Sequence, residues 1–152
     1  MRKLLVALML AGTGMLGAAA PASAATTNQR FVIIQRNDKP GTVVATGPIS
    51  GTGRDVEAPN GNSATFVFPN GTVGVNHPET SDHSTFNPIA CVGTDTFRGT
   101  YTLHNGTGAY AGVHGSGTYR GTATFIGRPT AHGCSDQGTT IVVVTATGHT
   151  SL

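Results

Sequence analysis

The amino-acid sequence predicts an all-β protein, a small antiparallel β-barrel of about eight strands in a single domain. Runs rich in Val, Thr, Phe and Tyr are separated by Gly, Asn and Pro roughly every ten residues, which is typical of β-sandwiches and barrels. No long stretch after residue 24 has a helical period. Glycine recurs inside the strand-like runs, where it suits the bends and bulges of a small closed barrel.

The expected strands follow one another along the chain. The early ones cover residues 30–35, 42–53, 63–68 and 72–76, with a tight turn at Pro69-Asn70-Gly71 before the last of these. Residues 77–88 are polar with two prolines, so we expect a longer loop there. The later strands cover residues 94–104, 113–126 and 139–148, with a loop at 128–138 that carries Cys134. We expect the final strand to complete the sheet.

Residues 94–104 alternate between two faces. Phe97, Tyr101 and Leu103 share one face, and Arg98 and His104 share the other. In a closed barrel one face must point inward, and large apolar side chains are the ones most often buried. The favoured arrangement therefore has the aromatic residues inside and the polar residues outside.

The first 24 residues have the anatomy of a secretory signal peptide. Arg2 and Lys3 form a charged start, an apolar centre follows at residues 4–10, and Ala22-Ser23-Ala24 is a small-residue cleavage site. The apolar centre is short and glycines follow it, which favours a cleaved peptide over a retained membrane anchor. We predict cleavage after Ala24, a secreted protein, and a single β-barrel domain at residues 25–152.

The predicted mature chain carries no net charge. The full chain has 9 basic and 7 acidic residues, and removing Arg2 and Lys3 leaves seven of each, a difference of zero. The remaining basic residues are scattered in the sequence, whereas nucleic acid and anionic lipid require clustered Lys and Arg. We expect no nucleic-acid partner, and no membrane contact after signal cleavage.

The sequence contains two cysteines, Cys91 and Cys134. Two cysteines in an exported chain usually pair, and this bridge would close a loop of about 44 residues, worth roughly 4 kcal/mol by chain entropy. The alternative is a catalytic thiol, because His132 precedes Cys134 by two residues and would share its face in a strand. The export prediction favours the disulfide.

One segment resembles a known group of barrels. Residues 97–119 read FRGTYTLHNGTGAYAGVHGSGTY, and the central GTGAYAGVHGSG at 106–117 resembles the strand–turn–strand of β-barrels related to allene oxide cyclase. Plant dirigent proteins carry a similar Gly-Thr-Gly, aromatic, Gly pattern. The chain is also similar to small secreted actinobacterial proteins of unknown function, through FVFPNG at 66–71, FNPIAC at 86–91 and the second cysteine.

The resemblance implies a barrel fold and two kinds of activity. Relatives include cyclases that fold a reactive, mostly apolar substrate inside the barrel, and proteins that steer radical coupling without being oxidants. The resemblance places no catalytic acid or base on a residue of this chain, and fold likeness alone does not establish activity.

Cofactor motifs are weak in this sequence. The glycine-rich turn at 106–117 is followed by a strand, whereas a phosphate-binding loop opens a helix. His77 and His83, with Glu79 or Asp82, form the best local cluster for a metal, but exposed loop residues are the favoured interpretation. We therefore expect no metal and no other cofactor.

If the barrel has a site, we expect it at the end near the glycine turn. The ligand-binding candidates are Arg98, His104, Tyr110 and His114. The two histidines flank the turn, so antiparallel strands could bring them together, with structural hydrogen bonding as the alternative role.

The pair of carboxylates that glycoside cleavage requires is hard to build from the seven scattered acids. Asp55 and Glu57 are the only close pair, and they lie beside a turn.

Two hypotheses of function follow. The first is a non-enzymatic exported module that binds a small apolar ligand or a cell-surface partner. The second is a cyclase or isomerase that works mainly by holding its substrate in a reactive shape. An enzyme of this type requires an open interior that reaches polar groups, whereas a structural barrel is filled by its own side chains.

Overall fold

A computed structural model describes residues 27–37, 39–131 and 133–152, which form nine β-strands and one short 3-10 helix. The strands are β1 (Thr27–Arg36), β2 (Gly41–Thr46), β3 (Gly51–Glu57), β4 (Ser63–Phe68), β5 (Gly71–Asn76), β6 (Glu79–Asn87), β7 (Val92–His104), β8 (His114–Thr130) and β9 (Gly133–Ser151), and the helix η1 is Gly108–Tyr110. The all-β fold class is thereby confirmed. The predicted signal peptide, residues 1–24, lies outside the described residues.

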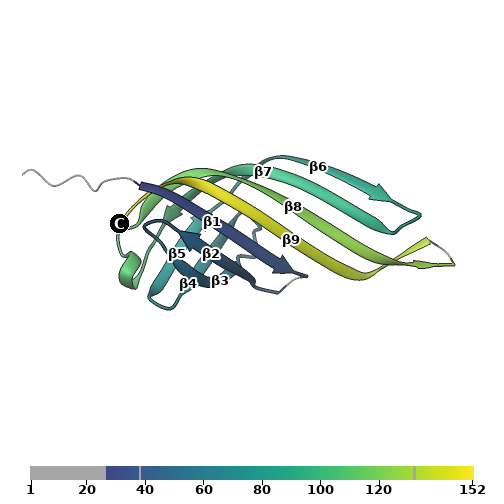
Figure 1. Cartoon of the computed structure of the whole chain (residues 1–152), viewed down its shortest axis with the longest axis horizontal. Coiled ribbons are helices and arrows are strands. Elements are labelled where there is room, and N and C mark those ends of the chain that lie inside the picture. The colour runs from purple at the N-terminus through teal and green to yellow at the C-terminus, as the bar shows by residue number, and fades with distance from the viewer. Residues whose placement is uncertain (1–26, 38, 132) are drawn as a thin grey trace, which may run out of the picture.

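Eight of these strands close into an antiparallel barrel (Figure 1). Strands β1 to β5 pair in chain order, and β9 lies between β1 and β8. β5 pairs with the end of β7 through Gly74–His104, Val75–Leu103 and Asn76–Thr102, which closes the ring. The final strand thus completes the sheet, as predicted.

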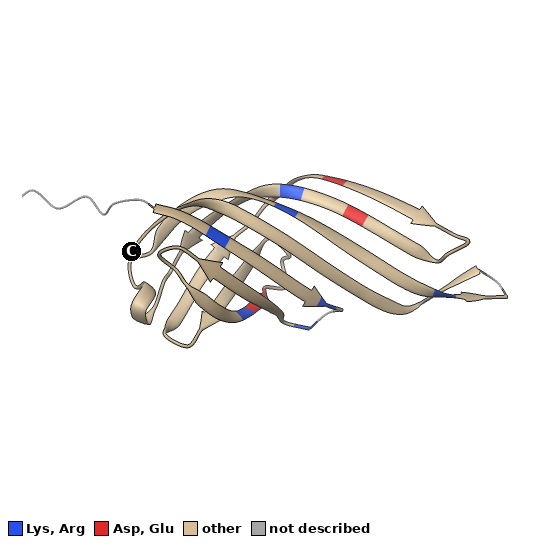
Figure 2. Cartoon of the chain, in the orientation of Figure 1, with Lys and Arg blue, Asp and Glu red and all other residues tan. Residues whose placement is uncertain are grey.

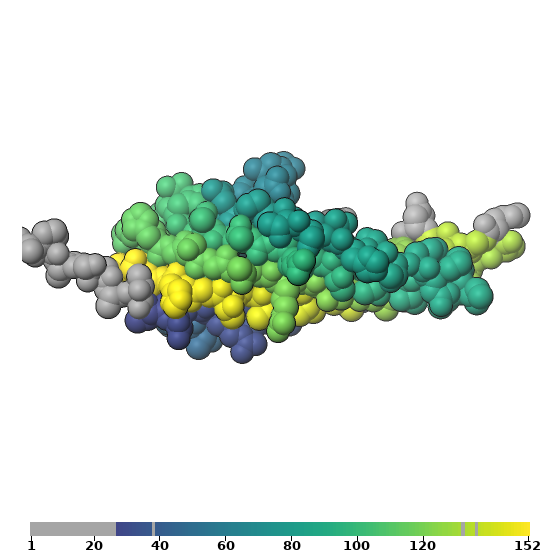
Figure 3. Space-filling model, turned by 90° about the horizontal axis from the view of Figure 1, so that it is seen from above, coloured from purple at the N-terminus to yellow at the C-terminus, as the bar shows by residue number. Residues whose placement is uncertain are grey.

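A four-stranded arm extends from one end of the barrel. β6 pairs with residues 92–99 of β7, and β8 and β9 continue their pairing out to Thr130 and Gly133. We call residues 79–98, 121–131 and 133–141 the arm. It runs on past the barrel in Figure 1, and Figure 3 shows that this half of the molecule is the narrower one.

The arm corrects two expectations. Residues 77–88 were expected to form a loop but contain β6, whose side chains are almost all exposed. A strand with polar residues on both faces has no hydrophobic alternation, so its sequence resembles a loop. Residues 128–138 were also expected to be a loop, but they continue the β8–β9 hairpin beyond a bulge between Ile126 and Arg128.

The single strand expected at 42–53 is divided into β2 and β3. The chain turns between Gly47 and Gly51, which have φ angles of 131° and 113°, in a region that favours glycine. The side chain of Gln29 holds this turn, because its Oε1 accepts from the Ile49 N–H at 2.9 Å and its Nε2 donates to the Ile49 carbonyl at 2.9 Å.

The core lies inside the barrel, and the aromatic face of β7 points into it. Tyr101 and Leu103 are buried, whereas Arg98 on the alternate face is exposed. This is the favoured arrangement of the two faces. The buried hydrophobic cluster comprises Phe31, Ile33, Val43, Ala45, Ile49, Ala64, Phe66, Phe68, Val73, Val75, Tyr101, Leu103, Tyr110, Val113, Tyr119 and Ala146.

The barrel end opposite the arm is filled by side chains. Ile49, Tyr110 and Val113 are buried there, and the Tyr110 ring meets Phe68 edge-on at 5.5 Å between centroids. The glycine turn packs against the β4–β5 turn, with the Ala109 N–H donating to the Asn70 carbonyl at 2.9 Å. Gly108 has a φ of 60°, and a side chain there would collide with that same carbonyl. Gly106, Gly115 and Gly117 are in similarly close contact with their neighbours, whereas Gly112 is not, so most glycines of residues 106–117 serve close packing.

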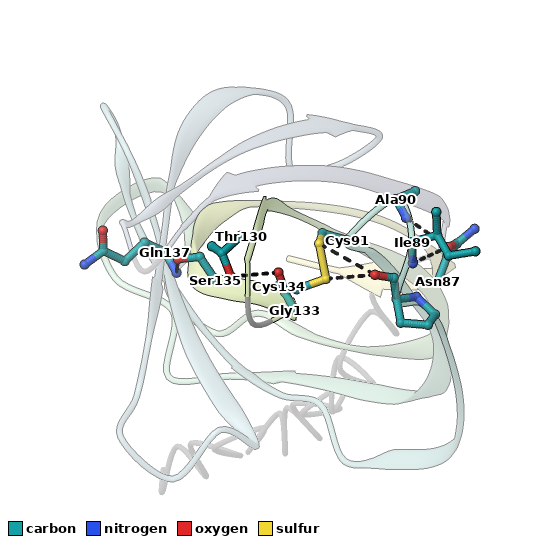
Figure 4. Close-up of a disulfide and its surroundings, with 10 residues drawn as sticks. Asn87, Ile89, Ala90, Cys91, Thr130, Gly133, Cys134, Ser135 and Gln137 are labelled. Atoms are coloured by element: carbon teal, nitrogen blue, oxygen red, sulfur yellow. Dashed lines mark hydrogen bonds between the residues drawn. A yellow bond between two sulfur atoms is a disulfide. The ribbon is translucent and has the colours of Figure 1, made fainter.

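The structure pairs Cys91 with Cys134 in a disulfide, with 5.4 Å between their Cα atoms. Figure 4 shows that the bond joins the β6–β7 turn to the outer end of the β8–β9 hairpin. The Asn87 side chain orders the first of these by accepting from the Ile89 and Ala90 N–H groups at 3.0 Å. The disulfide thus fastens the two hairpins of the arm to each other, far along the arm from the barrel.

Within the described residues, no helix is long and apolar enough to cross a membrane.

Candidate functional site

The barrel interior is open toward the arm. A cavity of about 540 Å³ occupies this end, and its lining includes the exposed residues Gly61 and Asn62, so it reaches the surface. Most of the lining is apolar: Phe31, Ile33, Ala64, Phe66, Val75, Phe97, Val142, Val144 and Ala146. The polar part of the lining comprises Gln35, Asp55, Glu57, Asn62, His77 and Glu79, with Tyr101 and Tyr119.

The position of the cavity follows from strand parity. Phe31 and Ile33 alternate with exposed or half-buried residues on β1. β9 places Ala146 and Val144 opposite them, with Val142 on the same face. Aromatic rings cluster in the interior, with Phe31 5.2 Å from Phe66 between centroids. The small side chain of Ala146 leaves space in the lining that a larger side chain would fill. Side chains therefore fill the barrel interior only in part.

Asp55 is the buried acid of this cavity. It lies on β3 with only 5% of its surface exposed, and its Oδ1 has no hydrogen-bond partner among the described residues. Burial is the main cause that raises the pKa of this carboxyl, and the nearby charge of Glu57 adds to the rise while His77 partly opposes it, which gives a pKa of about 6. A carboxyl with this pKa exchanges its proton near neutral pH, as catalytic acids and bases do.

His77 and Glu57 form an ion pair at the cavity rim. The His77 Nε2 lies 3.2 Å from the Glu57 Oε2, although the geometry is not that of a well-aligned hydrogen bond. The Glu57 contact raises the pKa of His77 most, the charges of Glu57 and Asp55 add to the rise, and burial opposes it. The imidazole therefore holds its proton more firmly than an exposed histidine, beside two carboxyl groups.

Tyr119 ties this cluster to the junction between barrel and arm. Its hydroxyl donates to the His77 carbonyl at 3.0 Å, and its ring meets the rings of His77 and Phe97 edge-on. Burial is the main reason that the pKa of Tyr119 is raised, so the phenol stays protonated. At this junction the chain leaves β5, passes through Pro78 and enters β6.

Gly99 on β7 permits the close approach of the segment between β5 and β6. The Thr100 N–H donates to the Pro78 carbonyl at 3.3 Å, which holds the corner between β5 and β6 against β7. A Cβ at Gly99 would collide with that carbonyl and lie 2.6 Å from the Tyr119 hydroxyl oxygen. The corner that presents His77 to the cavity therefore depends on a glycine at this position.

Chemically, the cavity combines an apolar chamber with an acidic, ionisable rim. It can enclose an apolar group and offer hydrogen-bond acceptors to an amine or hydroxyl. Asp55 and His77 could also move a proton at neutral pH.

The four candidate residues from sequence are not gathered around this cavity. Arg98 is exposed on the outer wall, and His104 lines a separate outer depression of about 260 Å³ beside Gly74. Tyr110 is buried in the filled end, and His114 is exposed at the start of β8. None of the four lines the interior cavity. Their role in binding stays a prediction.

The residues that do line the polar rim were missed for identifiable reasons. Asp55 and Glu57 were noted only as a close pair of acids, but their spacing of two places both on one face of a strand. That parity was the available signal. The sequence indicated His77 only as part of a possible metal cluster, because its orientation toward the cavity depends on the corner at Pro78.

The possible metal cluster in residues 77–83 is divided between two faces. His77 lines the cavity, whereas His83 on β6 pairs with Thr96 on the outer face. Among the described residues, no group of three or more His, Cys, Asp or Glu side chains is arranged to hold a metal.

Comparisons with protein-family models, with curated proteins and with solved structures found no match.

Proposed function

We propose that this chain is an exported β-barrel protein that holds a small, mainly apolar ligand inside the barrel, with a hydrogen-bond-donating or cationic end of the ligand at the acidic rim. The observation that carries the proposal is Asp55, a buried carboxyl in the wall of an otherwise mostly apolar cavity. Ligand sites commonly have this composition, an apolar lining with a few polar groups that fix orientation.

The unfavourable burial of Asp55 supports this assignment. A buried carboxyl without full hydrogen bonding destabilises the folded state at neutral pH. Such costs are concentrated at functional sites, where the strained or poorly solvated group has a task. The apolar residues around Asp55 would serve the structure equally well with a neutral residue at this position.

Native mass spectrometry of the protein from its own culture medium tests the proposal. We expect a bound species of a few hundred daltons that is released by organic solvent, consistent with roughly 300–1,000 Å³ for typical ligand pockets. A clean mass for the ligand-free chain, in both the wild type and Asp55→Asn, would contradict it. The same spectrum tests export, since cleavage after Ala24 predicts a chain that begins at Ala25.

A cyclase or isomerase is the second candidate, and the pKa of Asp55 near 6 favours it. An isomerisation leaves the mass of the ligand unchanged. In Asp55→Asn we therefore expect a captured ligand of the same mass as in the wild type but with a different chromatographic retention time. Identical retention times in the two proteins would favour the binding module over the enzyme.

A further inference from the structure

The charged side chains of this protein are sorted by face. In the regular strand pairings the arginines lie on the outer wall, on the face opposite the buried residues: Arg30, Arg36, Arg54, Arg98 and Arg120. Among the described side chains, the acids lie on the inner face of the barrel and arm: Asp55, Glu57, Glu79, Asp82 and Asp95. The regularly paired strands therefore have a basic outer wall and an acidic inner face.

Two of the outer arginines are directly opposed. Arg98 on β7 pairs in register with Arg120 on β8, and Figure 2 shows the two blue segments side by side. Directly opposed like charges on neighbouring strands repel each other. The Arg98 Nε donates to the Ser81 Oγ at 2.8 Å, which leaves the rest of its guanidinium available. In the described part of the chain, neither arginine has an acidic partner.

Hydroxyl groups surround this arginine pair. A groove of about 460 Å³ on the outer wall is lined by both arginines and by Thr80, Thr100, Thr118 and Thr145. Register pairing places Thr118 opposite Thr100, and Thr145 opposite Arg120. Guanidinium groups and hydroxyls are both hydrogen-bond donors, and arginine forks match the geometry of phosphate and carboxylate oxygens.

We propose that Arg98 and Arg120 form a binding site for a tetrahedral oxyanion of the phosphate or sulfate class on the outer wall. An oxyanion between the two guanidinium groups turns their mutual repulsion into attraction, and the threonine hydroxyls complete its hydrogen bonds. The site is separate from the interior cavity, because the neighbours Gly99 and Tyr119 face inward while the arginines face outward.

The oxyanion could be a free ion or a phosphate carried on a polymer, and the two differ in how far along the outer wall they would bind. A free ion needs the pair alone. A phosphate carried on a polymer would extend along the wall and also meet Arg30, whose row is shared with Thr147 and, through it, with Thr118. Dependence on Arg30 therefore separates a polymer from a free ion.

Isothermal titration of the purified protein with inorganic phosphate, at constant ionic strength, tests the site. We expect Arg120→Gln to weaken phosphate binding about tenfold or more, as expected for the loss of a charged hydrogen-bond pair. Arg54→Gln is the matched control, since it removes the same charge from the outer face of β3 and should leave the affinity unchanged.

Thermal unfolding keeps the test independent of variant folding. Without phosphate, Arg120→Gln should have a Tm equal to or above that of the wild type, because the like-charge repulsion is gone. Phosphate should raise the Tm of the wild type and of Arg54→Gln more than chloride does. It should raise the Tm of Arg120→Gln no more than chloride does. Equal phosphate effects in all three proteins, or none beyond that of chloride, would overturn the site.

Polyphosphate of defined length then identifies the source. If polyphosphate binds more tightly than inorganic phosphate, and Arg30→Gln weakens the binding of polyphosphate, the natural ligand is a polymer. Equal dependence on Arg98 and Arg120 without any effect of Arg30→Gln supports the free ion.

Discussion

The His77 Nε2 lies 3.2 Å from the Glu57 Oε2 at the rim of a cavity whose wall contains the buried Asp55. These residues come from the end of β3 and the segment after β5, which strand pairing through β4 brings together. The contact explains why the pKa of His77 is raised even though burial alone would lower it.

Replacing Glu57 tests this relationship. In Glu57→Gln the pKa of His77 should fall, because the largest cause of its rise is removed. The imidazole carbon and proton shifts, followed by NMR against pH, give the value directly. Glu79→Gln is the control, since Glu79 also lines the cavity but does not contribute to the shift of His77. An equal change in both variants would contradict the pairing.

Asp55 should make stability depend on pH. Its pKa rises from 3.8 unfolded to about 6 folded, so the folded state binds more protons between these values. The free energy of unfolding therefore falls as pH rises through about 4 to 6, by about 3 kcal/mol in total.

Asp55→Asn should remove this fall in the free energy of unfolding with rising pH. We expect the variant to match the wild type near pH 4 and to exceed its free energy of unfolding by about 1–3 kcal/mol at pH 8. Urea unfolding at the two pH values measures this. A variant that is less stable than the wild type at pH 8 would show that the carboxylate has compensating partners.

Gly99 should tolerate no side chain. Gly99→Ala should lower the free energy of unfolding by about 1–3 kcal/mol, because the new methyl group meets the Pro78 carbonyl and the Tyr119 hydroxyl. Gly93→Ala on the same strand is the control, since its Cβ would have only ordinary contacts, the nearest at 3.5 Å. Similar losses in denaturant unfolding of both variants would contradict the close approach at Gly99.

The disulfide should stabilise the arm. Replacing Cys91 and Cys134 by serine should lower the free energy of unfolding by roughly 4 kcal/mol on the chain-entropy estimate. Hydrogen exchange should quicken first in β6 and the outer parts of β8 and β9, because the bond joins these hairpins. Unchanged exchange in the arm would show that strand pairing alone holds it.

The barrel was predictable from local pattern, and the arm was not. The alternation of Phe97, Tyr101 and Leu103 with polar residues indicated the inner face of β7. β6 has exposed residues on both faces, so no periodicity marked it. Its strand is held by pairing with β7, a partner that the sequence alone does not indicate.

The site was less predictable because it depends on which barrel end is filled. We predicted a site at the barrel end near the glycine turn, but this turn itself places Tyr110 of η1 and Val113 into that end. The opposite end stays open because its lining includes small residues such as Ala146. Local periodicity gives the face of a residue but not the depth to which the interior is filled.

Uptake of a neutral apolar dye such as N-phenyl-1-naphthylamine tests the central claim, that the barrel interior is a ligand site. Ala146→Phe places a ring into the cavity, whereas Thr122→Phe places the same ring on the outer wall of β8. We predict dye fluorescence in the wild type and in Thr122→Phe, and its loss in Ala146→Phe at unchanged Tm. No uptake by the wild type, or equal uptake by all three proteins, would contradict the account.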